Sequence, residues 1–352
     1  MAALEDCVAL SLFPLSLRRL IGERLRSGCP ADTLASSLLA SGDANVHAAA
    51  ARVPGILSEA RRRGLTAVAW ADAHYPVLLS AISDPPPLLW IRGHVSAFDA
   101  PAVAVVGSRA GSPYALAVAE RLGGDLASLG VTVVSGLARG VDSAAHRGAT
   151  TCGVSIAVLG SGADVIYPPE HRALAEEIAQ AGAVVSELSP GTRPRKVFFP
   201  LRNRIISGLC RAVVVVEAGE KSGSLITARC ALEQGRDVLA VPGNVLNGRN
   251  RGGHALLRDG ARVVESARDV LEELGLTPVQ LKPSLPDAAS NPQAGARSTD
   301  PVLASLDPGE ASDLEGIAER SGLPVSRLLP RLMELELAGL IARVGGGRFV
   351  RI

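Results

Sequence analysis

From residue 102 onward, the chain alternates short runs of small or β-branched apolar residues with segments of helical character. The apolar runs cover residues 103–106, 131–134, 154–159, 183–186, 213–216 and 238–241. Both faces of each run are apolar, as expected of strands in a sheet that helices cover on both sides. Strands that alternate with helices are connected in parallel. The pattern therefore predicts an α/β core over residues 96–276, with a doubly wound, mostly parallel sheet.

The segments on either side of this core have other patterns. Residues 1–95 carry helical spacing at 15–25 and 33–39 and end in a Pro-rich stretch, which predicts a helical N-terminal domain. Residues 277–299 hold four prolines among small and polar residues and are expected to form a flexible linker. Residues 300–352 then combine two helical segments, a glycine turn and a Gly-rich strand pair. That order is typical of a winged helix.

Charge and cysteine content limit the classes of function. The net charge is only +1, so any affinity for a polyanion must come from local clusters of cations. The five cysteines are scattered and predict neither a disulfide framework nor a zinc site. Glu5 and Asp6 precede a short apolar run broken by Pro14, which fits neither a signal peptide nor a membrane span. We therefore expect a cytoplasmic protein without a metal site or membrane contact.

The loops that follow the predicted strands are rich in glycine and serine. They include Gly107-Ser108-Arg109, Ser135-Gly136, Arg139-Gly140 and Ser222-Gly223-Ser224. Ligands of open α/β sheets bind beyond the carboxyl ends of the strands, where backbone N–H groups at helix N-termini favour anions. The first loop lacks the G-x-G-x-x-G pattern of dinucleotide sites, and no P-loop pattern is present. Phosphate groups are thus expected as ligands, and no cofactor is predicted.

Residues 195–208 contain four cations and two phenylalanines, and no acid occurs between Glu187 and Glu217. Cations contact phosphates and aromatic rings stack on bases, so this composition favours binding of a single nucleic-acid strand. A solvated basic loop is the alternative interpretation. The last domain has the opposite character, with ten acids against eight bases from Glu273 onward. Binding of protein, or no binding, is therefore expected there rather than the duplex binding of a transcription factor.

Asp142 and His146 occupy positions i and i+4 of one predicted helix and, with Ser143, could form a hydrolytic trio. An acid near a helix start is usually a cap, and a single histidine on such a helix is usually a packing residue. We therefore predict no enzyme activity and no catalytic residues. The alternative is a hydrolase of nucleoside-monophosphate glycosidic bonds, or a nucleotide sensor, that uses the same pocket. Glu217 or Glu233 would be the acid of the hydrolase.

Several motifs in a fixed order resemble one known family. They are VAVVGSR (103–109), VSGLARGVD (134–142) with His146, AVLG (157–160) with Tyr167-Pro168, FPLRNRIISG (199–208), VEA (216–218) with SGSL (222–225), and AVPG (240–243). Tyr75-Pro76 and Asp84-Pro-Pro86 also fit. The sequence is similar to the DprA/Smf family, the DNA-processing proteins of bacterial natural transformation. Gly252-Gly253-His254 departs from the family's usual Gly-Thr/Cys-Asn.

The resemblance implies a helical, SAM-like N-terminal domain, a Rossmann-like core that holds single-stranded DNA, and a winged helix. Members of the family bind and protect incoming single strands, and they help to load the RecA recombinase in place of single-strand-binding protein. Single-stranded DNA, RecA and single-strand-binding protein are therefore the expected partners in competence and recombination. The core is also expected to form a homodimer. The resemblance adds no enzyme activity.

The predicted interface joins these loops to basic and aromatic side chains. Its loop residues are Gly107, Ser108, Ser135, Gly136, Gly140, Ser222, Gly223 and Ser224, and its cations are Arg109, Arg139, Lys196, Arg202 and Arg204. Phe199 is expected to stack on a base, while Asn203 either contacts the strand or braces the loop. For Arg202 and Arg204 the alternative is internal ion pairing. By resemblance, Arg109, Lys196 and Phe199 match the family's strand-gripping positions.

Overall fold

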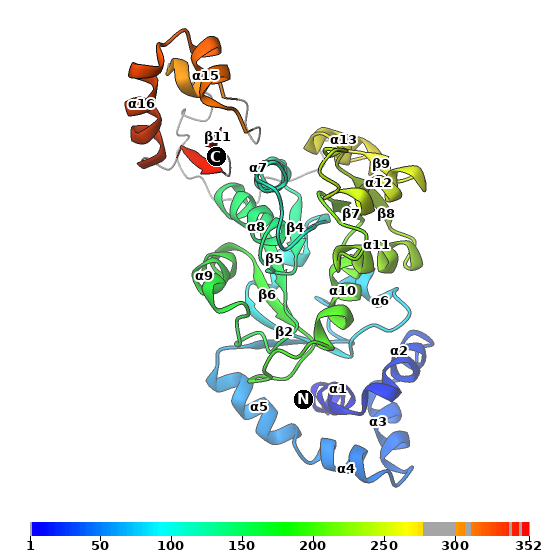
Figure 1. Ribbon diagram of the computed structural model, residues 1–352. Helices are drawn as coiled ribbons and strands as arrows, with labels where there is room; N and C mark the ends of the chain where they lie inside the picture. The colour runs from blue at the N-terminus through cyan, green and yellow to red at the C-terminus, as the bar shows by residue number, and fades with distance from the viewer. Residues whose placement is uncertain (1, 277–299, 307–310, 338–339, 345–346, 352) are drawn as a thin grey trace.

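The computed structural model describes residues 2–276, 300–306, 311–337, 340–344 and 347–351 (Figure 1). The predicted linker at 277–299 lies outside the described residues. One nine-stranded sheet forms the core, in the order β1-β2-β6-β5-β4-β3-β7-β8-β9. The pairs β1–β2 and β2–β6 are antiparallel and all the other pairs are parallel. The prediction of a mostly parallel, doubly wound sheet is confirmed.

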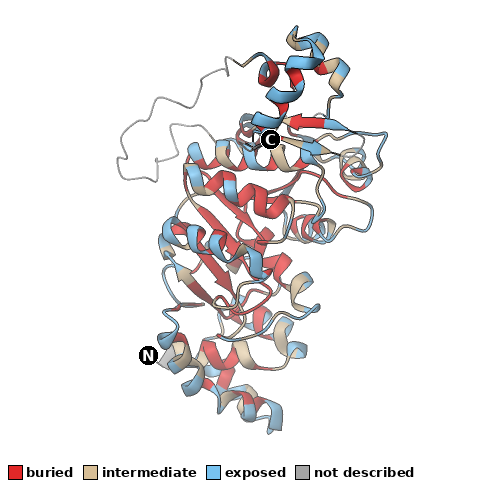
Figure 2. Cartoon of the chain, turned by 60° about the vertical axis from the view of Figure 1, so that its left-hand side comes forward, coloured by how far each residue is buried: buried red, intermediate tan, exposed pale blue. Residues whose placement is uncertain are grey.

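The strand bounds lie close to the apolar runs of the sequence. The strands are β1 (Thr66–Ala69), β2 (Leu88–Gly93), β3 (Ala102–Val106), β4 (Thr132–Ser135), β5 (Ser155–Val158), β6 (Ala183–Ser186), β7 (Ala212–Val215), β8 (Asp237–Ala240) and β9 (Arg262–Val263). The central strands β3 to β7 are buried along their whole length, as Figure 2 shows. Burial on both faces explains why their sequences are continuous apolar runs.

Residues 66–93 differ from the prediction, which placed them in a helical domain. They contribute β1 and β2 to the sheet, with a short helix between the two strands, and β2 pairs with β6 through a register that includes Trp90 opposite Ser186. The helical part ends at Arg62 and comprises α1 (Ala2–Leu12), η1 (Leu15–Leu17), α2 (Arg18–Arg26), α3 (Ala31–Leu39), α4 (Ala44–Ala50) and α5 (Val53–Arg62). These helices share a buried cluster with Leu88 and Trp90. The helical unit therefore packs against the antiparallel end of the sheet (Figure 1).

Helices cover both faces of the sheet. On one face, α7 (Pro113–Ser128), α8 (Val141–Cys152) and α13 (Ala267–Glu273) pack against Val103 and Val105. On the other, α6 (Val77–Ser80), α10 (Phe198–Gly208) and α11 (Ser224–Glu233) pack against Ala104 and Val106. The remaining elements of the core are η2 (Val95–Phe98), η3 (Pro169–His171), α9 (Arg172–Ala181) and α12 (Arg251–Arg258). Within the described ranges, no helix combines the length and apolar character needed to cross a membrane.

The C-terminal unit has the predicted winged-helix order. It consists of α14 (Pro301–Ala304), α15 (Leu314–Ser321), α16 (Val325–Leu337), β10 (Ile341–Val344) and β11 (Arg348–Arg351). The Asp313 carboxylate accepts the Gly316 N–H at the start of α15, and Gly322 ends the helix with a left-handed backbone, φ 69°. Leu328 and Leu332 of α16 pack against Phe349 of the hairpin. The prediction of a winged helix is confirmed.

The strand order reverses between β3 and β7, which are neighbours in the sheet although three strands, β4, β5 and β6, lie between them in sequence order. The chain leaves β3 toward β4 on one side, whereas β7 leads to β8 on the other. The loops after β3 and β7 therefore diverge and leave a crevice at the carboxyl ends of the strands. Such a switch point is where ligands of this fold class bind.

Candidate functional site

A cavity of about 820 Å³ lies at the switch point. Ten predicted site residues line it: Gly107, Ser108, Arg109, Lys196, Phe199, Arg202, Asn203, Ser222, Gly223 and Ser224. Five predicted residues do not line it: Ser135, Gly136, Arg139, Gly140 and Arg204. Its walls also contain Tyr167, Asp142 and Lys221, which were outside the predicted set. The fold thus brings together segments that are more than a hundred residues apart in the sequence.

The loops after β3 and β4 touch directly beside this cavity. The Val141 N–H donates to the Ser108 carbonyl over 3.2 Å, and the Ser108 N–H donates to the Glu217 carbonyl over 2.7 Å. Gly140 has φ +79°, and a Cβ at this position would overlap the Ser108 carbonyl oxygen. Only glycine fits both the left-handed backbone and the close approach. Gly140 therefore sets the spacing of the two loops and need not contact a ligand itself.

Arg109 and Lys196 are the predicted cations whose charges remain available at the cavity, beside the exposed Lys221. Both side chains belong to exposed residues, and neither forms an ion pair with any described residue. The Arg109 guanidinium carbon lies 5.5 Å from the centre of the Phe199 ring. A cation over an aromatic face is an attractive contact that leaves the charge accessible to an anion. The two residues are therefore placed to attract phosphate.

Two aromatic rings meet at the same wall. The centres of the Tyr167 and Phe199 rings are 5.6 Å apart, with an angle of 46° between the ring planes. Phe199 is half-buried, whereas Tyr167 is 41% exposed. Tyr167 follows β5 and reaches the cavity from the loop, so its position at the carboxyl end of a strand was the available sequence signal.

Arg202 has a more internal place than predicted. Its buried guanidinium donates to the carbonyls of Gly136 and Val158, at the ends of β4 and β5. Burial lowers the pKa of Arg202 to about 10, with Asp142 opposing the shift and Arg109 adding to it. The side chain therefore stays charged at neutral pH and holds the floor of the cavity.

Asp142 lies beside Arg202 and is also buried. Its carboxylate accepts the N–H groups of Gly136 and Ala138, over 3.1 and 3.4 Å. Burial raises the pKa of Asp142, while Arg202 and the backbone donors act in the opposite direction. The group therefore braces the loop after β4, as a capping residue does.

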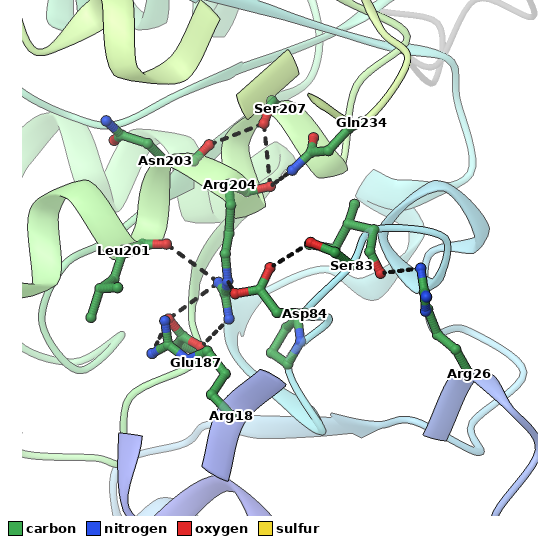
Figure 3. A network of polar contacts seen from close by, with 12 residues as sticks. Arg18, Arg26, Ser83, Asp84, Glu187, Leu201, Asn203, Arg204, Ser207 and Gln234 are labelled. Atoms are coloured by element: carbon green, nitrogen blue, oxygen red, sulfur yellow. Dashed lines mark hydrogen bonds and ion pairs between the residues drawn. The ribbon is translucent and has the colours of Figure 1, made fainter. Parts of the chain in front are cut away.

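Arg204 does not line the cavity, and its side chain points toward Asp84 and Glu187 (Figure 3). Its buried guanidinium donates to Asp84 over 2.8 Å and to Glu187 over 2.7 Å. Arg18 of α2 reaches the same Glu187 over 3.4 Å. Internal ion pairing, the alternative left open by the sequence, describes this residue. We remove Arg204 from the candidate interface because its hydrogen-bonding capacity is used by the two carboxylates.

Ser135 and Arg139 also differ from the predicted role. Ser135 is fully buried, and its hydroxyl donates to the Val105 carbonyl over 2.7 Å. The exposed Arg139 forms an ion pair with Glu170, which raises the pKa of Arg139 through their hydrogen bond. The serine stabilises the pairing of β4 with β3, and the arginine is already partnered. Neither offers a free group to a ligand in this arrangement.

The serine loop before α11 forms the opposite wall. The hydroxyls of Ser222 and Ser224 lie 2.7 Å apart, and Gly223 between them is exposed. The Asn203 amide donates to the Gly223 carbonyl over 3.3 Å and so braces this loop from α10. The loop places backbone donors at the start of a ten-residue helix, where an anion is favoured.

The two acids considered for hydrolysis do not line this cavity. Glu217 is buried, and its carboxylate accepts the Ser112 N–H over 3.1 Å and the Ser112 hydroxyl over 2.5 Å. Glu233 is exposed at the end of α11. Among the residues that the structure describes, no cluster of potential ligands could hold a metal ion.

The departure at Gly252-Gly253-His254 leaves a polar side chain nearby. Asn250 is buried and accepts the Ala218 N–H over 2.9 Å, while its amide donates to the Val241 carbonyl over 3.1 Å. A Cβ at Gly253 would overlap the Asn250 side chain, so this glycine makes room for the asparagine. A His254 ring nitrogen lies 3.0 Å from the Gly243 carbonyl.

His146 makes stability depend on pH. It is fully buried with a ring nitrogen 2.7 Å from the Ser155 hydroxyl, and burial lowers its pKa from 6.5 to about 3. Between these values the unfolded chain binds the proton and the folded chain does not, so stability falls as pH falls below 6.5. We expect this group alone to lower the free energy of unfolding by about 2 kcal/mol from pH 7 to pH 5.

Urea unfolding at several pH values measures this effect against His146→Asn, which can keep the hydrogen bond but does not titrate. The free energy of unfolding of the variant should change less between pH 7 and pH 5 than that of the wild-type protein. Equal slopes in both proteins would contradict a buried neutral histidine.

The family models that match this chain cover most of its length. A model for DNA recombination-mediator protein A matches residues 66–275, and a model for the DprA winged helix domain matches residues 286–347. Protein Smf of Escherichia coli (strain K12) is 45% identical over 287 residues, which cover 79% of this chain and 75% of the relative. DNA processing protein DprA of Streptococcus pneumoniae is 47% identical over 203 residues, 57% of this chain and 72% of the relative.

Two solved structures share the fold. The X-ray structure of DprA from Streptococcus pneumoniae is similar with a TM-score of 0.67 and 40% identity, covering 75% of this chain and 95% of that one. DNA processing protein A from Helicobacter pylori, studied for its single-stranded DNA binding mode, is similar with a TM-score of 0.54 and 29% identity. That likeness covers 60% of this chain and 95% of the other.

Proposed function

This chain belongs to the DprA/Smf family of DNA processing proteins, and from that premise we propose that its core binds single-stranded DNA in the crevice between β3 and β7. One observation carries the proposal. Arg109 and Lys196 present unpaired charges, among the described residues, in the same cavity as the Phe199 ring. An unpaired strand exposes phosphates, which contact cations, and bases, which stack on aromatic rings.

Each group of the cavity has a role in this proposal. Phosphates contact Arg109, Lys196 and the Ser222–Ser224 loop at the start of α11, and Phe199 stacks on a base. Stacking accepts every base because each has a flat face, so little sequence preference is expected. A duplex keeps its bases paired and stacked internally, and we expect it to bind much more weakly.

Further parts of the proposal come from family membership. We infer that the protein acts without enzyme activity in natural transformation, in the cytoplasm, and that it helps to load RecA in place of single-strand-binding protein. A homodimer through the Rossmann-like core belongs to the same proposal. Support for the absence of hydrolysis comes from Glu217, which Ser112 holds outside the cavity. A nucleoside-monophosphate hydrolysis assay tests that alternative directly.

The salt dependence of binding tests the function. If about six phosphates are neutralised, the logarithm of the affinity for a single strand should fall with the logarithm of the salt concentration with a slope of about −4. Fluorescence anisotropy with a 30-base thymidine strand at several salt concentrations measures the slope, and a duplex of equal length is the control. Equal affinity for strand and duplex, or no binding at low salt, would contradict the proposal.

A further inference from the structure

Tyr167 stands apart from the residues of the proposed interface, although its ring lines the same cavity. The residue is 41% exposed, and the centre of its ring lies 5.6 Å from the centre of the Phe199 ring. Tyr167 thus presents an exposed aromatic face at the cavity, and aromatic faces are the surfaces on which unpaired bases stack. We propose that Tyr167 is a second base-stacking ring, an inference that rests on the proposed binding of single-stranded DNA.

One face of the Phe199 ring is already covered by the Arg109 side chain in this structure. The Arg109 guanidinium carbon lies 5.5 Å from the centre of that ring. Gly160 lies close to the ring edge, because a Cβ added to this glycine would be 3.0 Å from Cδ1 of Phe199. A base that stacks on this face of Phe199 displaces the Arg109 side chain. Tyr167 has no cation over its ring among the described residues, so its exposed surface is open to a base.

The segment that carries Tyr167 is held on both sides. Before it, the Ser161 hydroxyl donates to the Val165 carbonyl over 2.6 Å. After it, Glu170 pairs with Arg139, and a ring nitrogen of His171 lies 2.9 Å from the Leu137 carbonyl. A ring held in place before binding loses little conformational entropy when a base stacks on it. The loop is therefore built to present Tyr167.

The angle between the two rings determines whether one base can stack on both. Because the planes of Tyr167 and Phe199 meet at 46°, one flat base cannot lie parallel to both rings. The rings then take different bases, and the strand must unstack between them. Thymidine strands, which stack weakly on themselves, should for this reason be preferred to adenosine strands, but only modestly, in keeping with the low sequence preference of the site.

The experiment compares wild-type protein with Tyr167→Ala and Tyr167→Phe by anisotropy, on a 12-base thymidine strand and on an abasic strand of equal length. Tyr167→Ala should weaken binding of the thymidine strand by about 5- to 150-fold, and Tyr167→Phe should retain the wild-type affinity. The slope of affinity against salt should remain unchanged, because stacking neutralises no phosphate. On the abasic strand, wild-type and Tyr167→Ala should bind alike.

Tyr114→Ala is the matched control, since Tyr114 is 38% exposed but lies outside this cavity. An equal loss on the thymidine and abasic strands would overturn the inference and assign Tyr167 a purely structural role. Unchanged affinity in Tyr167→Ala would overturn it as well, while the proposed function would stand. No binding of either strand by the wild-type protein would instead reject the proposed function itself.

A comparison of homopolymers tests the two-ring arrangement. The wild-type protein should bind a thymidine strand more tightly than an adenosine strand of equal length, and Tyr167→Ala should narrow that difference. Equal affinities in the wild-type protein would reject the separate placement of two bases.

Discussion

The double substitution Arg109→Ala/Lys196→Glu should lower the affinity for a 30-base single strand on the order of 100-fold at moderate salt. Arg109 and Lys196 are two of the three exposed cations that line the cavity, with Lys221 as the third, and no described carboxylate pairs with either of them. The change removes two positive charges and adds a negative one where phosphates are expected. It should also make the salt slope shallower by about 1.4, because two fewer phosphates are neutralised.

Anisotropy titrations across a range of salt concentrations measure both effects. Arg211→Ala/Arg229→Glu is a control with the same change in net charge, because Arg211 and Arg229 are exposed and lie outside the cavity. The control should keep its affinity to within a few-fold. If both double variants lose affinity equally, the general charge of the protein binds DNA and the cavity is not the site. Thermal unfolding of both variants should match the wild type, since neither substitution reaches a buried group.

Arg204→Met should destabilise the fold by about 3–5 kcal/mol without acting through the DNA site. The buried guanidinium of Arg204 contacts Asp84 and Glu187, which come from segments 120 and 17 residues away in sequence (Figure 3). Methionine fills a similar volume but leaves two carboxylates without this partner. Removing one member of a buried ion pair is costly because the remaining charge stays in a poorly solvated place.

Urea unfolding of Arg204→Met against Arg229→Met measures the loss. Arg229 lies on the neighbouring helix α11 and is exposed, so its replacement should change stability by less than about 0.5 kcal/mol. The DNA affinity of folded Arg204→Met should remain near the wild-type value. A large loss of affinity with unchanged stability would return Arg204 to the interface from which the geometry removes it.

Much of the core could be predicted from local sequence because of how its strands are buried. A strand covered on both faces must be apolar at every position, so runs such as 213–216 mark β7 within one residue. The loops at the carboxyl ends of these strands could be located for the same reason. Arg109, Lys196 and Phe199 lie in or beside those loops, and the structure brings them to one cavity.

Other features depended on pairing between distant segments. The strands β1 and β2 become part of the sheet only because they pair with each other and β2 pairs with the edge of β6 nearly a hundred residues later. A local pattern cannot show that partner, so residues 66–93 were predicted as part of a helical unit. Ser135 likewise occupies a loop-like Ser-Gly position, yet its hydroxyl bonds to the neighbouring strand at Val105.

Lys196 and Arg204 differ in a way that sequence alone does not determine. Amino-acid sequence alone determined that this chain has a parallel sheet, glycine and serine loops at its carboxyl edge, and a basic, aromatic segment beside them. The tertiary structure decided which cations remain available, because that depends on where helix α10 buries each side chain and which distant carboxylates meet it. Arg204 meets Asp84 and Glu187 inside the protein, whereas Lys196 precedes the helix and stays in solvent. The sequence gives the position of each charged residue in the chain, but only long-range packing decides whether a carboxylate of the same protein neutralises it.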